Sequence, residues 1–208
     1  MENSRAYKYL IEQVDAVGSK KMDGYYPKIM EEIYDWERNE VEDIIWETFH
    51  KNNDYDLAMF FPKLKNYNGI EELKNTLEKC RIPSGNSVNI AKVLYENTCD
   101  NFYIEIIKKN IEKAPNNSTF VAMISYARPS EELYNLLVEV YINCNDKIIR
   151  GSAIRGILYN KGFINNPYDF KEIIGKTSLR KMFHKDSQVE RKEVINNLER
   201  GVYDKYKE

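Results

Sequence analysis

The chain has 208 residues, a formal net charge of −2, a hydrophobic fraction of 42% and a charged fraction of 31%. A chain of this length and composition can bury a continuous core, which excludes an intrinsically disordered protein. No stretch approaches about 18 consecutive apolar residues, which excludes a membrane-spanning helix.

Apolar residues follow a helical period almost throughout, and nine glycines and six prolines are few for this length. Helix breakers are therefore scarce, and we predict an all-α fold. Three helices are predicted before residue 50, each with one buried stripe at spacing i, i+3, i+4, i+7. The three stripes are Tyr7, Leu10, Ile11, Val14 and Val17, then Tyr26, Ile29, Met30, Ile33 and Trp36, then Val41, Ile44, Ile45 and Phe49.

Polar residues that favour helix N-termini divide the middle of the chain into further helices. Asn68 and Glu71 form a capping box at the start of the next helix. The later helices are predicted to start at Ser87, Asp100, Ser118, Ser130 and Asp146, and Gly162 is predicted to end the last of them. A short helix around Phe170 and a final helix opened by the capping box Ser187–Glu190 complete the chain.

Three alanines, Ala91, Ala122 and Ala153, stand 31 residues apart within short apolar runs. Such a fixed spacing is typical of stacked helical repeats, in which a small residue lets neighbouring helices approach closely. Over residues 69–162 the pattern resembles HEAT-like repeats. The resemblance implies a right-handed α-solenoid of antiparallel helix pairs. We therefore predict one all-helical domain over 1–208, with N-terminal helices in 1–68, repeats in 69–162 and a C-terminal helical cap in 163–208.

The sequence offers no pattern for catalysis, a metal or a cofactor, and we predict a non-enzyme with none of them. The only two histidines, His50 and His184, lack neighbours at metal-ligand spacing. The three cysteines, Cys80, Cys99 and Cys144, are expected to be small buried residues in a reducing compartment. With no apolar leader behind Met1, we expect a cytoplasmic protein.

The distribution of charge is more informative than the net charge. Between Tyr25 and Asp56 the sequence has ten acidic and three basic residues. Between Lys147 and Lys192 it has eleven basic and four acidic residues. These segments can be ordinary solvated helix faces, or charged surfaces that steer a partner of opposite sign. Tyr26 and Trp36 are expected in the core. The predicted partner-binding residues are Tyr25, Tyr34, Asp35, Glu40, Asp43, Glu47 and Tyr55, because tyrosines and carboxylates together suit a basic protein.

These features predict a monomeric, non-catalytic protein-binding module. In size, composition and loose repeats the chain looks like the small bacterial immunity proteins that neutralise a toxin by binding it. That resemblance implies a basic toxin domain as partner, since the targets of such proteins are often nucleases. A membrane partner is not expected.

Two alternatives stay open. The first is nucleic-acid binding through the basic end, with Arg150, Arg155, Arg180 and Lys181 on phosphates, although the overall acidity makes nucleic acid a less favoured partner. The second is a scaffold or adaptor protein.

Overall fold

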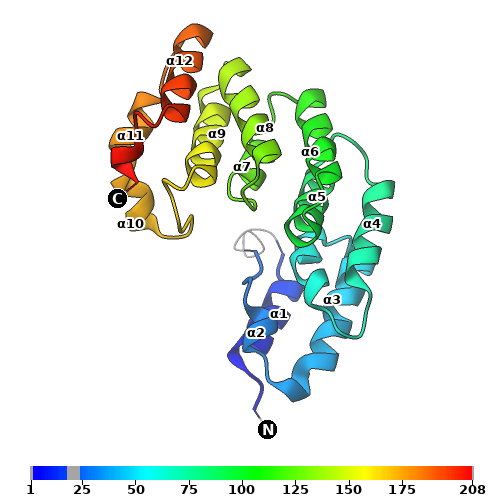
Figure 1. The fold of residues 1–208 in the computed structure, drawn as a ribbon. Coiled ribbons are helices and arrows are strands. Elements are labelled where there is room, and N and C mark those ends of the chain that lie inside the picture. Colours follow the sequence, from blue (N-terminus) through cyan, green and yellow to red (C-terminus); the bar gives the residue numbers. More distant parts are fainter. Residues whose placement is uncertain (1, 18–23, 208) are drawn as a thin grey trace. The chain divides into compact units, whose positions relative to one another are not determined.

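The computed structural model describes residues 2–17 and 24–207. Helices follow one another through these ranges and no strand occurs in them, which confirms the all-α prediction (Figure 1). None of the helices in these ranges is long and apolar enough to cross a bilayer. The contacts group the chain into two compact units, Met1–Cys80 and Arg81–Glu208, and the division falls inside the segment predicted to hold the repeats.

The first unit is built around α3. Its elements are α1 (Arg5–Asp15), α2 (Ile29–Glu32), the 3₁₀ helix η2 (Asp35–Glu37), α3 (Arg38–Asn52), the 3₁₀ helix η3 (Tyr55–Lys63) and α4 (Gly69–Lys79). Val41, Ile45 and Phe49 form the buried stripe of α3, and Phe60 and Phe61 of η3 are buried with them. The predicted stripe of the third helix is thus confirmed, with Ile44 only half-buried. In α1 only Leu10 of the predicted stripe is buried, together with Ala6 and Gln13, and Val17 lies beyond the helix and is exposed.

The second predicted helix, with its stripe from Tyr26 to Trp36, is wrong as a continuous element. Only one turn, α2, forms, and the backbone at Ile33 is extended (φ −72°, ψ 154°). The chain then restarts at η2, where the buried Glu37 carboxylate accepts hydrogen bonds from the backbone N–H of Tyr34 (2.8 Å) and of Ser4 (2.7 Å). This contact with a residue 33 positions away decides the break, and the apolar spacing carries no sign of it.

The second unit holds the remaining helices. They are α5 (Gly85–Thr98), α6 (Phe102–Lys113), α7 (Ser118–Ile124), α8 (Glu131–Asn143), α9 (Lys147–Asn160), α10 (Phe170–Gly175), α11 (Thr177–Met182), α12 (Gln188–Glu199) and the 3₁₀ helix η4 (Asp204–Tyr206). Helix α7 contacts both α5 and α9, and α8 contacts both α6 and α12, while α5 packs on α6 and α8 on α9 (Figure 1).

The three alanines are not equivalent in this unit, so the predicted 31-residue register is wrong at its middle member. Ala91 in α5 and Ala153 in α9 are fully buried, but Ala122 in α7 is exposed. Close approach of α7 and α9 occurs instead at Ser125, whose hydroxyl donates to the Ser152 carbonyl oxygen (2.9 Å). Helix α7 has only seven residues, and its buried face does not include the alanine.

Two asparagines, one buried and one half-buried, tie helix starts to neighbouring helices. The Asn110 side chain of α6 accepts from the Ser84 backbone N–H (2.9 Å), and the Asn160 side chain of α9 accepts from the Ser130 backbone N–H (3.0 Å). Ser84, rather than the predicted Ser87, is therefore the N-cap of α5. The predicted starts at Ser130, Asp146 and Ser187 are confirmed, as is the stop at Gly162, where φ is +72°.

Candidate functional site

An exposed row of carboxylates runs along α3. Glu40, Asp43 and Glu47 are all exposed and stand at spacing i, i+3, i+7, which places them on one face of the helix. This face is distinct from the stripe of Val41 and Ile45, which is buried in the first unit. We refer to Glu40, Asp43 and Glu47 as the acidic row.

Two tyrosines from other parts of the first unit orient the acidic row. The Tyr7 hydroxyl donates to Glu40 (2.7 Å), and the Tyr67 hydroxyl donates to Asp43 (2.6 Å). These hydrogen bonds, with a contribution from burial, raise the pKa of Tyr7 and the pKa of Tyr67, so both hydroxyls stay protonated donors at neutral pH. Each carboxylate can accept further hydrogen bonds through its remaining lone pairs, so the two groups are preorganised and still able to bind donors.

Little positive charge compensates the acidic row. Glu47 pairs with Lys51 (2.6 Å) in an exposed i, i+4 ion pair. Within the described ranges, neither Glu40 nor Asp43 has a lysine or arginine at ion-pair distance. The row therefore presents negative charge to solvent.

The predicted site residues Tyr34 and Asp35 lie just before α3 and are exposed. The Tyr34 ring packs against the Trp36 ring with centroids 6.1 Å apart. Trp36 is 47% exposed and Tyr26 is half exposed, so the expectation that these two aromatics belong to the core is wrong. The physical reason is that the predicted helix does not form over this stretch: α2 covers only Ile29–Glu32, so Tyr26 precedes it and Trp36 follows it in η2.

The other two predicted tyrosines are not exposed. Tyr25 is only 6% exposed and meets Phe60 edge to face, while its hydroxyl hydrogen-bonds to Asp54. Burial, followed by the hydrogen bond to Asp54, raises the pKa of Tyr25. Tyr55 is half-buried with its ring edge to face against Phe49. The exposure expected for Tyr25 is thus wrong, because its ring fills the core of the first unit.

Two acidic residues between Tyr25 and Asp56, Glu37 and Glu42, are buried and stabilise the fold of the first unit. Their structural role was not predicted from the sequence. Glu42 is fully buried and accepts hydrogen bonds from Arg38 Nε (2.8 Å) and from the backbone N–H groups of Lys65 and Asn66. Glu42 stands three residues before Ile45 of the apolar stripe, and this spacing could have predicted its burial. Glu37 is also fully buried, and only its distant hydrogen-bond partners explain it.

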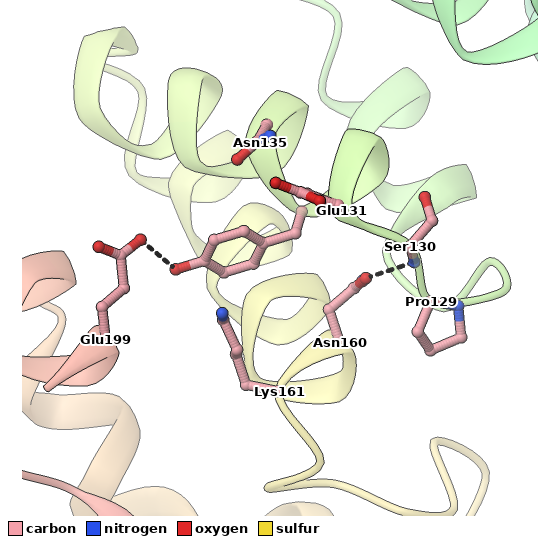
Figure 2. A pocket seen from close by; sticks show the side chains of 8 residues that line it. Pro129, Ser130, Glu131, Asn135, Asn160, Lys161 and Glu199 are labelled. Carbon is pink, nitrogen blue, oxygen red and sulfur yellow. Dashed lines mark hydrogen bonds between the residues drawn. The ribbon is translucent and has the colours of Figure 1, made fainter. Parts of the chain in front are cut away.

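The second unit contains a pocket of about 540 Å³ where α8, α9 and α12 meet. Figure 2 shows Glu131, Lys161 and Glu199 reaching it from the first turn of α8 and from the ends of α9 and α12. Its eight lining residues are Pro129, Ser130, Glu131, Tyr134, Asn135, Asn160, Lys161 and Glu199.

The polar groups of this pocket mostly engage one another. Lys161 Nζ lies 4.0 Å from the centre of the Tyr134 ring, and the Tyr134 hydroxyl donates to Glu199 (3.2 Å). Burial, followed by the charge of Glu199, raises the pKa of Tyr134, so its hydroxyl cannot act as a base near neutral pH. The arrangement joins three helices and assembles no nucleophile with an activating base.

The four predicted phosphate-binding residues have different environments. Arg150 is 7% exposed, and its guanidinium donates to the carbonyl oxygens of Cys144 (3.2 Å) and Asn145 (2.7 Å) just after α8. It satisfies backbone acceptors at a helix C-terminus and is not available to a phosphate, which corrects the prediction for this residue. Arg155 and Arg180 are half-buried, and Lys181 is exposed.

The histidines and cysteines differ in exposure. His50 and His184 are exposed. None of the three cysteines is fully buried and Cys99 is exposed, so their assignment to the core is wrong. Across the described ranges, no group of three or more His, Cys, Asp or Glu residues is placed to hold a metal ion.

Comparison with known proteins does not identify the chain. No protein-family model, no curated protein and no solved structure matches it.

Proposed function

We propose that this chain is a non-catalytic protein-binding module that recognises a basic partner protein through the acidic row of α3. The observation that carries the proposal is the preorganisation of Glu40 and Asp43 by the Tyr7 and Tyr67 hydroxyls on an exposed helix face. Fixed carboxylates lose little conformational freedom when a partner binds, so more of the interaction appears as affinity. Their uncompensated charge also speeds the encounter with a basic surface.

The helices of the second unit support the repeat part of this proposal. Helix α7 contacts α5 and α9, and helix α8 contacts α6 and α12. Contacts between alternate helices of this kind are expected for an α-solenoid of HEAT-like pairs. The roles that fit a protein-binding module of this kind best are those of an immunity protein that occupies the basic active site of a toxin, or of an adaptor. A cytoplasmic, monomeric protein fits the same proposal.

The partner is sought in the product of the neighbouring reading frame. We expect the two proteins to copurify as a 1:1 complex with an affinity of nanomolar order, measured by titration calorimetry. The triple substitution Glu40→Lys, Asp43→Lys and Glu47→Lys should weaken the complex by about 100-fold or more, because like charges would then face each other.

A control with the same change in net charge separates local from global electrostatics. The substitutions Glu78→Lys, Glu105→Lys and Glu112→Lys alter three exposed carboxylates outside α3. We expect this control to weaken binding by less than about tenfold, through long-range steering alone. Equal losses in the two triple variants would refute the acidic row as the contact surface, and the lack of any complex would refute the immunity role.

A further inference from the structure

Two large aromatic side chains lie beside the acidic row and are not buried by the fold. Tyr34 is 51% exposed and Trp36 is 47% exposed, although their rings are in contact with each other. Single exposed aromatics are common at protein surfaces, whereas Tyr and Trp concentrate at the energetic centres of interfaces. The pair is therefore the best candidate in the first unit for an anchor to a partner.

The aromatic pair and the acidic row belong to one surface. The backbone is right-handed and helical through Glu37 (φ −84°, ψ −16°) and Arg38 (φ −54°, ψ −49°), so η2 runs directly into α3. Trp36, Glu40, Asp43 and Glu47 then stand at spacing i, i+4, i+7, i+11, which keeps them along one side of this helical path. A partner that contacts the carboxylates also meets the indole ring.

We infer that the Tyr34–Trp36 pair is a stacking site for a guanidinium group, and that it selects arginine over lysine in the basic partner. This inference rests on the proposed function. A guanidinium is planar, is more weakly hydrated than an ammonium, and stacks on aromatic faces as well as pairing with carboxylates. Cation–π attraction is strongest on Trp, and the neighbouring Asp35 and Glu40 are exposed and complement the charge.

The test uses two synthetic peptide probes that differ only in their basic residue, one with alternating Gly and Arg and one with alternating Gly and Lys. Their affinities for the full chain are measured by fluorescence polarisation at low salt. We expect the Arg peptide to bind about fivefold more tightly than the Lys peptide, the factor that one exposed cation–π contact supplies.

Three variants test whether the preference for the Arg peptide comes from the Tyr34–Trp36 pair. Trp36→Leu, and independently Tyr34→Leu, should bring the two peptides close to equal affinity while the Lys peptide binds as before. Phe102→Leu is the matched control, because Phe102 is also an exposed aromatic (59%) but lies in α6 of the second unit. It should leave the preference unchanged. Far-ultraviolet circular dichroism confirms that each variant is folded.

The outcomes distinguish this inference from the proposed function. Equal binding of both peptides by the wild-type chain, or a preference that survives both leucine variants, would overturn the guanidinium site alone. Replacing the three carboxylates of the acidic row by their amides should weaken both peptides equally. If that replacement has no effect, or if neither peptide binds the wild-type chain, the acidic surface fails and the inference fails with it.

Discussion

Replacing Gly156 by alanine adds one methyl group at the closest approach of α7, α8 and α9. A Cβ atom built on Gly156 would lie 2.7 Å from Leu137 Cδ1, 3.0 Å from the Ser125 carbonyl oxygen and 3.1 Å from Ser125 Cα. The leucine methyl can move, but the two backbone atoms cannot move without shifting α7. Overpacking of this kind typically costs about 1–3 kcal/mol.

Gly151 provides a matched control in the same helix. A Cβ atom at Gly151 would meet nothing within 4 Å, so alanine there adds only the gain in helix propensity, about 1 kcal/mol. Both substitutions lower the entropy of the unfolded chain equally. The difference between the two variants therefore isolates the steric cost, and we expect Gly156→Ala to be about 1–3 kcal/mol less stable than Gly151→Ala.

The assay is urea unfolding followed by circular dichroism at 222 nm, with the slope of each transition compared between variants. Gly151→Ala should unfold at a higher urea concentration than the wild type, and Gly156→Ala at a lower one. Equal midpoints for the two variants would show that α7 and α9 do not approach as closely as the structure indicates.

Five other substitutions test four separate features. Cys99 has a left-handed backbone (φ 58°, ψ 21°), so Cys99→Gly should raise the free energy of unfolding by up to about 1 kcal/mol, visible as a higher melting temperature. Burial raises the pKa of Glu37, but hydrogen bonds to its charged form outweigh burial and leave the pKa lowered. Glu37→Gln should therefore cost about 1–3 kcal/mol at pH 7, and the cost should shrink in urea titrations as pH falls below the ordinary glutamate pKa, since protonation then removes the advantage of the wild type. Arg150→Ala should lower the unfolding free energy by about 1–3 kcal/mol, because it removes a buried side chain and the charged donor to the Asn145 carbonyl oxygen. Lys181→Ala should change it by less than about 0.5 kcal/mol; a reversed order would contradict the capping role of Arg150. Asp43→Asn removes like-charge repulsion on α3 but also replaces the charged acceptor of the Tyr67 hydroxyl by a neutral one. It should therefore change stability by less than about 0.5 kcal/mol while weakening the complex with the proposed basic partner; unchanged binding would contradict a contact at Asp43.

Much of the helical content follows from local chemistry and could be predicted. The starts at Ser130, Asp146 and Ser187 depend on side chains that accept hydrogen bonds from backbone groups two or three residues later, and such caps are visible in a short stretch of sequence. Distant contacts were not visible. The choice of Ser84 over Ser87 as the N-cap of α5 depends on Asn110 from the following helix.

The repeat register failed for a related reason. A 31-residue spacing of alanines compares positions along the chain, but burial depends on where each helix begins and how long it is. Ala122 lies in α7, which is half as long as α5 and α9, the helices that carry the other two alanines. Val121, Ile124 and Ser125 belong to the buried face of this segment instead. Small residues at close approaches were expected correctly in kind, since Ser125 and Gly156 fill that role, but not in position.

At the candidate site, the number of acidic residues in the sequence does not give the charge at the surface. Of the acidic residues between Glu37 and Glu47, two are fully buried and hold the first unit together, and their charge is not available to a partner. The helical stripe could separate Glu42 from its exposed neighbours, whereas Glu37 could be assigned only from its hydrogen bond to Ser4. The surface charge of the segment is therefore smaller than its composition suggests, and is concentrated in the acidic row.

The acidic row is costly for the helix that carries it. Glu40 and Asp43, and then Asp43 and Glu47, stand three and four residues apart, spacings at which like charges destabilise a helix by about 0.2–0.5 kcal/mol per pair. A surface selected for stability alone would place a lysine at one of these positions. Instead, tyrosine hydroxyls from α1 and from the segment before α4 donate to two of the carboxylates, which fixes the negative groups without neutralising them. Local rules broken in this way are expected at functional sites, and this is the physical reason for proposing α3 as the binding surface.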